Sequence, residues 1–159
     1  MAKEGTKILG ISCFYHDSAA ALLIDGEVVA AAQEERFTRK KHDEDFPRNA
    51  ISYCLSSQGL TIDDIDHIVF YDKPIATFER LLQTFFKSWP RGLQLFILAM
   101  RSWLKQKLWV EHTICKELNW EKDILFTEHH YAHAASAYYS SPFSKSVVVT
   151  MDGVGEWTS

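Results

Sequence analysis

Short apolar runs alternate with polar turns over the first part of the chain. The runs occupy residues Lys7 to Cys13, Ala19 to Ile24 and Glu27 to Gln33. Tyr15 to Ser18 forms a polar turn between the first two runs. Asp25-Gly26, a pair that favours a two-residue hairpin, separates the last two. The pattern therefore predicts two consecutive hairpins, and so a three-stranded antiparallel unit.

A charged segment, a helix and a fourth strand are predicted next. Residues 34–42, EERFTRKKH, hold six charged side chains. This run indicates either a solvated loop or helix start, or a basic loop that faces an anionic substrate. Pro47 suits the first position of a helix, and the apolar residues after it repeat at helical spacing. His67 to Tyr71 predicts a fourth strand.

The second half of the chain predicts helices between further strands. Phe78 to Leu118 carries Phe, Leu and Trp at spacings of three and four, interrupted at Pro90. This predicts at least two amphipathic helices whose apolar stripe packs inward. Ile124 to Thr127 predicts a short strand and Glu128 to Tyr139 a helix. Ser146 to Met151 lacks polar alternation, which predicts a central strand buried on both faces.

Composition and charge narrow the class of protein. A chain of 159 residues with 47% hydrophobic and 24% charged residues suits one ordinary globular domain. Because the net charge is -4, we expect neither a nucleic-acid nor a membrane partner. The three cysteines form no CxxC pair, so no disulfide framework is indicated. With no signal peptide and no apolar stretch of about 20 residues, we expect a cytoplasmic location.

Histidines near the end of the chain offer metal-binding chemistry. Three of the seven histidines lie in residues 129–133, HHYAH. His129 and His133 share one helix face, the spacing at which two imidazoles can bind one metal ion, and His130 and His133 could also share a face. Asp152 follows the predicted strand, where a carboxylate would complete a two-histidine, one-carboxylate ligand set. The alternative is a histidine cluster that is only hydrogen-bonded.

A second candidate lies in the first predicted turn. His16 can act as a general base near neutral pH, and Asp17 and Ser18 beside it could help to cradle a phosphate. An ordinary Asp/Ser turn is the alternative. The sequence contains no Walker-type P-loop, no GxGxxG and no G-x-S-x-G motif, so three common enzyme classes receive no support.

Four segments in order resemble one known family. They are ILGISCFYHDSAAALLIDG, EERFTRKKH, EHHYAHAASAYYSSPF and VVVTMDGVGEWTS. Together they closely resemble the N-terminal region of carbamoyltransferases of the nodulation and antibiotic-tailoring type. The resemblance is weakest over the predicted helical insertion.

The resemblance implies a fold class and an activity. The fold would be α/β, the N-terminal half of an actin-like ATPase (ribonuclease H-like) domain, with a mixed sheet that opens with β-hairpins. Residues 1–159 would form the N-terminal part of that domain, with a helical insertion at about residues 77–118 and the C-terminal domains absent. Such enzymes use ATP to move a carbamoyl group from carbamoyl phosphate, via carbamoyl adenylate, to a hydroxyl of a sugar or natural product.

The resemblance also implies residue roles. His129, His133 and Asp152 would bind a divalent metal, with iron as the expected ion. His16 would act as base on the acceptor hydroxyl, and Lys41 would line the same site. The turn that approaches the nucleotide phosphates would contain two glycines, Gly153 and Gly155. A small-molecule acceptor is the expected partner, and a homodimer of the full-length protein is compatible with the family.

Other functions remain open. The remaining metal carboxylate, the adenosine pocket and the adenylate-forming domain have no counterpart here, so we expect this chain to be inactive alone. A tRNA-modifying threonylcarbamoyl transferase of the same fold is disfavoured by the acidic balance. A non-catalytic metal- or nucleotide-binding module is a third hypothesis. The HxxxH pair argues against a fourth, a sugar-kinase-like phosphotransferase.

Overall fold

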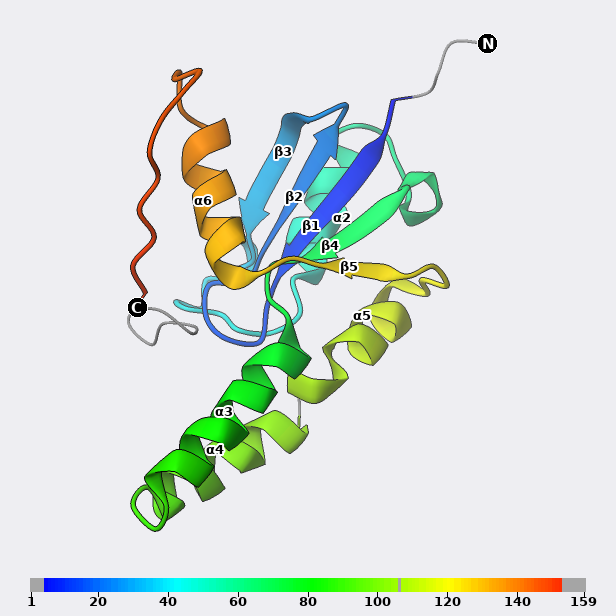
Figure 1. Cartoon of the computed structure of the whole chain (residues 1–159). Helices are drawn as coiled ribbons and strands as arrows, with labels where there is room; N and C mark the ends of the chain where they lie inside the picture. Colours follow the sequence, from blue (N-terminus) through cyan, green and yellow to red (C-terminus); the bar gives the residue numbers. More distant parts are fainter. Residues whose placement is uncertain (1–4, 106, 153–159) are drawn as a thin grey trace. The chain divides into compact units, whose positions relative to one another are not determined.

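The computed structural model describes residues 5–105 and 107–152, which divide into two compact units. The first unit comprises residues 5–71 and 111–126, and the second comprises residues 72–110 and 127–152. The elements of both units are labelled in Figure 1.

The first unit is built on a five-stranded mixed sheet with the order β3-β2-β1-β4-β5 (Figure 1). Its strands are β1 (Lys7–Ser12), β2 (Ala19–Ile24), β3 (Glu27–Gln33), β4 (His67–Phe70) and β5 (Ile124–Phe126). The first three strands pair antiparallel, which confirms the predicted hairpins. Strand β4 pairs parallel with β1, and β5 pairs parallel with β4, so the sheet combines both kinds of ladder.

One face of this sheet forms the core of the first unit. Alternate residues of the strands point to it, as the period of two in a β-strand requires. Helix α2 (Arg48–Ser56) contacts β2 and β3 and adds its own apolar stripe. The buried side chains that line this core include Leu9, Ile11, Leu22, Ile68, Phe70, Ala50, Ile51 and Cys54.

A buried carboxylate ties β3 to the start of α2. Glu34, only 3% exposed, follows β3 directly and precedes the short helix α1 (Glu35–Thr38). Its carboxylate accepts hydrogen bonds from the backbone N–H groups of Asn49 (3.2 Å) and Ala50 (2.8 Å). These N–H groups lie in the first turn of α2, where they lack helical acceptors. Glu34 therefore replaces a local N-cap, and the charged run begins buried rather than solvated.

The turns after α2 lead back to the sheet. The short 3-10 helix η1 (Ile62–Asp64) is closed by a capping box between Thr61 and Asp64. Helix α5 (Val110–Leu118) precedes β5, and an ion pair joins its Glu117 to Arg48 of α2.

The second unit contains the helical hairpin and the histidine-bearing helix. The hairpin consists of α3 (Pro74–Ser88) and α4 (Leu93–Lys105), followed by η2 (Lys107–Trp109), and a later segment forms α6 (His129–Tyr139). Aromatic side chains join the two hairpin helices. The rings of Phe85 and Phe96 stack at 3.8 Å, and those of Phe78 and Trp103 lie 5.8 Å apart. The predicted pair of amphipathic helices is confirmed. The prediction that their apolar stripe packs inward is wrong for Phe86, Trp89, Leu93 and Ile97, which are exposed because the contact between the helices covers only part of the stripe. None of the described helices is long and apolar enough to cross a membrane.

The prediction of a central strand at residues 146–151 is wrong. The segment has extended but unpaired backbone, and it is exposed, with Val147 92% accessible. A buried strand needs hydrogen-bonding neighbours on both sides, and none of the described strands pairs with this one. The apolar run therefore suggested a strand, but the described residues provide no neighbouring strand for it to pair with.

Candidate functional site

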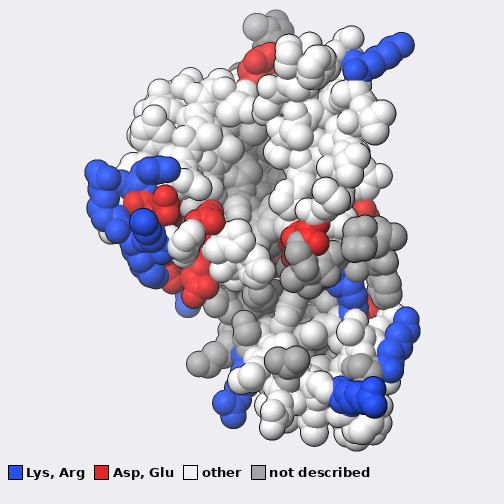
Figure 2. All heavy atoms as spheres, turned by 90° about the vertical axis from the view of Figure 1, so that its left-hand side faces the viewer, with Lys and Arg blue, Asp and Glu red and all other residues white. Residues whose placement is uncertain are grey.

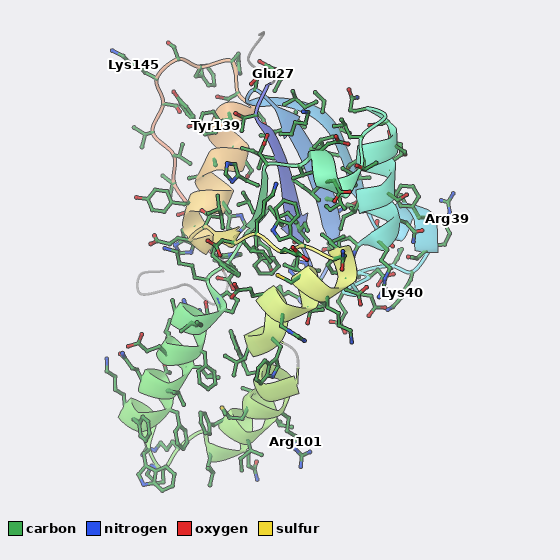
Figure 3. The ribbon with its side chains drawn as sticks, turned by 90° about the vertical axis from the view of Figure 1, so that its right-hand side faces the viewer. Glu27, Arg39, Lys40, Arg101, Tyr139 and Lys145 are labelled. Atoms are coloured by element: carbon green, nitrogen blue, oxygen red, sulfur yellow. The ribbon has the colours of Figure 1, made fainter. Side chains whose placement is uncertain are left out.

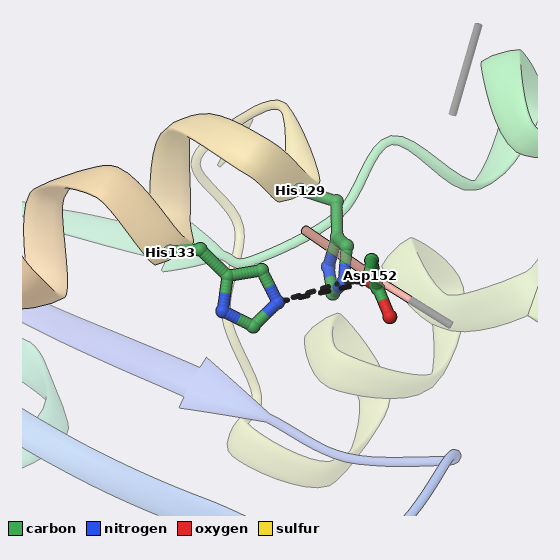
Figure 4. Close-up of side chains that lie close together, drawn as sticks. All are labelled: His129, His133 and Asp152. Atoms are coloured by element: carbon green, nitrogen blue, oxygen red, sulfur yellow. Dashed lines mark hydrogen bonds and ion pairs between the residues drawn. The ribbon is translucent and has the colours of Figure 1, made fainter. Parts of the chain in front are cut away.

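Helix α6 places two histidines on one face. Glu128, with extended backbone, precedes the helix, and its carbonyl accepts the first helical hydrogen bond from Ala132. His129 and His133 are therefore one turn apart, and their rings meet edge to face at 4.5 Å. Asp152 approaches the same pair from the extended segment (Figure 4). These three residues are called the helix cluster below.

The donor atoms of the helix cluster converge on one point. The Nε2 atom of His129 lies 2.7 Å from Oδ2 of Asp152 and 3.1 Å from Nε2 of His133. The remaining pair, His133 Nε2 and Asp152 Oδ2, is 3.9 Å apart. His129 and Asp152 are partly buried, whereas His133 is exposed. The helix cluster therefore has one open side.

Among these three side chains, hydrogen bonds alone satisfy the arrangement only if the Nε2–H of His129 is shared between Asp152 Oδ2 and a lone pair on His133 Nε2. A neutral imidazole nitrogen carries either a hydrogen or a lone pair. If His129 Nε2 carries a hydrogen and donates it to Asp152, it has no lone pair to receive His133. If it instead accepts from His133, its lone pair faces the carboxylate oxygen. A cation bound by all three atoms requires no shared hydrogen, because each atom then presents a lone pair to the ion.

Two of the three distances suit adjacent ligands of one metal ion, whereas the 3.9 Å between His133 Nε2 and Asp152 Oδ2 suits ligands at a wider angle around it. Imidazole nitrogens bind zinc at about 2.0–2.1 Å, so two nitrogens at right angles around an ion lie about 3 Å apart. The 3.1 Å between the two Nε2 atoms agrees with this value. Two imidazoles and a carboxylate also form the ligand set of non-haem Fe(II) sites, which leave positions open for other ligands. The predicted ligands are thus close together, and His130 is not among them.

A second group of two histidines and one aspartate lies in the first unit. Asp17 Oδ2 is 2.8 Å from Nδ1 of His16, and Asp17 Oδ1 is 3.0 Å from Nδ1 of His42. An ionised carboxylate only accepts, so each imidazole donates its Nδ1–H. Hydrogen bonds from His42 and from His16 lower the pKa of the Asp17 carboxyl below its ordinary value. These three residues are called the loop cluster.

Two loops with unusual backbone hold the loop cluster. Phe14, Asp17 and His42 have positive φ angles of 69°, 52° and 54°. This region is rare for residues other than glycine, and it persists only where the surroundings fix it. Backbone hydrogen bonds supply that constraint: Phe14 N–H donates to Glu44, and Ser18 N–H donates to Asp43.

The loop cluster contains one residue that the sequence analysis singled out as a base, His16, and one that it did not single out, His42. The sequence predicted His16 as a base. It did not predict the hydrogen bond between His16 and Asp17, or the hydrogen bond between His42 and Asp17. Lys41 is exposed and directly precedes His42, so it lies on the same pair of loops as His16. The predicted nucleotide-binding residues Gly153 and Gly155 lie outside the described residues. His42 could have been noticed because it ends the charged run. Its contact with Asp17 was not predictable from a local pattern, because the two residues are 25 positions apart in the sequence.

Comparison with known protein families decides the identity of the chain. A family model described as carbamoyltransferase N-terminus matches residues 7–159. The chain belongs to this carbamoyltransferase family. The resemblance stated from the four sequence segments is confirmed.

Three individual relatives match nearly the whole of this chain. The nodulation protein NolNO of Sinorhizobium fredii is 38% identical, and the match covers 92% of this chain and 21% of that protein. An uncharacterized Synechocystis protein, sll1178, is 54% identical over 97% of this chain and 26% of its own length. An uncharacterized Methanocaldococcus jannaschii protein, MJ1058, is 27% identical over 95% of this chain and 31% of its own length. The chain thus spans between about a fifth and a third of the length of these relatives.

Proposed function

We propose that this chain supplies the metal-binding and proton-accepting part of an ATP-dependent O-carbamoyltransferase. The reaction would move a carbamoyl group from carbamoyl phosphate, via carbamoyl adenylate, to a hydroxyl of a sugar or natural product. Membership of the family supports the type of reaction. The observation that carries the proposal is the convergence of three donor atoms in the helix cluster, all within 4.8 Å of one another.

His129, His133 and Asp152 would hold a divalent metal, with iron expected from the family resemblance. A bound divalent cation supplies Lewis acidity, which polarises a carbonyl or a phosphoryl oxygen. Asp152 contributes negative charge that offsets part of the charge of the ion, and the exposed side of His133 leaves room for a substrate oxygen. The residues thus bind and orient, while other groups move the proton.

His16 would accept the proton of the acceptor hydroxyl. Its Nδ1–H is donated to Asp17, so the Nε2 atom of the neutral ring carries the lone pair. In the transfer step, the hydroxyl oxygen forms a bond to the carbamoyl carbon and the bond from that carbon to the adenylate oxygen breaks. AMP leaves, and the hydroxyl proton passes to His16 Nε2. The charge of Lys41 would attract the anionic carbamoyl donor.

The wider fold and partners form part of the same proposal. A mixed sheet that begins with two hairpins is consistent with an actin-like ATPase domain, in which Gly153 and Gly155 would approach the nucleotide phosphates. The acceptor would be a small molecule. We expect the chain to need the residues that its longer relatives possess for activity.

Metal analysis of the purified chain tests the proposal. We expect about one transition-metal ion per chain in the parent and none in His133→Ala, because that substitution removes one of three protein ligands. His112→Ala, an exposed histidine on α5, serves as the matched control and should keep the metal. If the parent contains no metal after incubation with Fe(II) without oxygen, or if His133→Ala retains it, the proposed site is wrong.

A further inference from the structure

The helical hairpin has a charge opposite to that of the rest of the chain. Residues 74–105, which form α3 and α4, contain five Lys or Arg and one acidic residue, a net charge of +4. The remaining residues contain 12 Lys or Arg and 20 Asp or Glu, a net charge of -8. The expectation of no membrane partner rested on the charge of the whole chain, which averages these two regions.

The end of the hairpin exposes large apolar side chains. Phe86 is 72% exposed and Trp89 61% exposed, and both lie where α3 turns into α4. Leu93 and Ile97, one turn apart on α4, are exposed as well. The contacts between the helices use other rings, since Phe85 stacks on Phe96. Phe86 and Trp89 contact the ring of Phe85 at 5.7 and 5.5 Å, but most of their surface stays accessible.

Basic side chains lie beside these apolar ones. Lys87 and Arg91 flank Trp89 in the sequence, and both are exposed. Arg101 is exposed on α4, one turn beyond Ile97, and extends outward in Figure 3. In the lower part of Figure 2, over the hairpin, Lys and Arg side chains border a surface without charge. We call the set Phe86, Lys87, Trp89, Arg91, Leu93 and Ile97 the hairpin tip.

We propose that the hairpin tip docks onto an anionic lipid surface. Trp and Phe favour the membrane interface, where an aromatic body meets hydrocarbon and polar groups meet water. Lys and Arg next to them are attracted by anionic headgroups, and the two effects together give peripheral binding. A tip of this kind would bring the chain to a membrane without crossing it.

The charge argues against a second copy as the occupant. In a two-fold contact, the same patch of each subunit faces itself, so two hairpins of net charge +4 would be brought together. Repulsion between like charges would oppose that contact, whereas an anionic surface neutralises it. The inference rests on the hairpin alone and does not depend on the proposed metal site.

Vesicle sedimentation of the 159-residue chain tests this inference. We expect the parent to sediment with vesicles of phosphatidylcholine mixed with phosphatidylglycerol, and to do so far less with pure phosphatidylcholine. High salt should weaken the binding. The double variant Lys87→Glu/Arg91→Glu should bind the mixed vesicles more than about tenfold more weakly. Phe86→Ser/Trp89→Ser should also lose binding.

Matched variants away from the hairpin tip control for changed charge and changed apolar surface. Lys145→Glu and Val28→Ser alter exposed residues elsewhere and should bind as the parent does. Circular dichroism would check that each variant is folded. The inference is overturned if the parent does not sediment with the mixed vesicles, or if the control variants lose as much binding as the variants of the hairpin tip. A dimer that Phe86→Ser/Trp89→Ser dissociates, in a chain that does not sediment, would identify a second copy instead.

Discussion

The loop cluster and the helix cluster contain the same residue types but differ in geometry. In the loop cluster, each imidazole meets its own oxygen of Asp17, at 2.8 and 3.0 Å. In the helix cluster, one oxygen of Asp152 and two Nε2 atoms crowd together, with His129 Nε2 contacting both of the others. In the first arrangement each contact is a separate hydrogen bond, whereas in the second three donor atoms lie within 4.8 Å of one another, as they would around a cation. The comparison shows that two histidines and one aspartate can take two different arrangements, which their residue types alone do not distinguish.

The largest expected effect follows from removal of the proposed base. In a full-length relative that carries the same motif, a substitution equivalent to His16→Ala should lower the rate of carbamoyl transfer by about 10²–10⁴-fold. Its metal content should not change, because the loop cluster provides no metal ligand. Steady-state kinetics and metal analysis of the same preparation would check both points. An unchanged rate would remove His16 from the mechanism.

Removal of a proposed ligand from the helix cluster should weaken metal binding. His129→Ala should weaken metal binding by more than about 100-fold, since even partners one shell further out typically contribute 10–100-fold. The fold should persist because His129 is a partly exposed helix residue. His42→Ala is the matched histidine in the loop cluster and should bind metal as the parent does. Titration with metal, followed by calorimetry, would measure the difference, and equal affinities would contradict the assignment.

The loop cluster should also depend on the buried carboxylate of Glu34. Glu34→Ala leaves the N–H groups of Asn49 and Ala50 without an acceptor, which should lower the free energy of unfolding by about 1–3 kcal/mol. The backbone N–H of Glu34 also donates to the carbonyl of Ser18, beside Asp17. Urea unfolding would measure the loss, with exposed Glu27→Ala as a control that should change little. Equal stabilities would show that Glu34 does not support α2.

The smallest expected effect is a pH dependence of stability. Because the pKa of Asp17 is lowered in the folded chain, its contacts stabilise the fold above the ordinary carboxyl pKa and are lost as pH falls through the lowered value. Between about pH 5 and pH 2, Asp17→Asn should therefore lose less stability than the parent. Thermal unfolding across this range would detect the difference. Parallel pH profiles would mean that Asp17 makes no net contribution.

Local sequence patterns predicted most of the strands and helices. They also predicted that His129 and His133 lie together, but not that Asp17 and His42 do. The bounds of β2 and β3 follow from apolar runs around Asp25-Gly26, and the spacing of His129 and His133 is a property of any helix. The contact between Asp17 and His42 joins loops far apart in sequence and depends on positive φ angles. The periodicity of apolar residues predicts neither this contact nor these φ angles. The parallel pairing of β4 with β1 was likewise not predicted, since it is a long-range property.

The prediction at residues 146–151 failed for a related reason. An apolar run such as SVVVTM indicates that a segment suits burial, but burial requires partners on neighbouring strands. Asp152 was nevertheless expected near the two histidines, and it does lie there, at the end of an extended segment that is not part of the described sheet. The proximity of the three residues was therefore predicted correctly, although the predicted strand before Asp152 is not present.

The exposed valines before Asp152 have a consequence for handling the protein in solution. Val147 and Val149 are largely exposed, and the N–H and C=O groups of this segment join none of the described ladders. Such a segment can add as a strand to an equivalent segment of a neighbouring molecule. In concentrated solution, we thus expect self-association of this chain to begin at the residues that lead into Asp152.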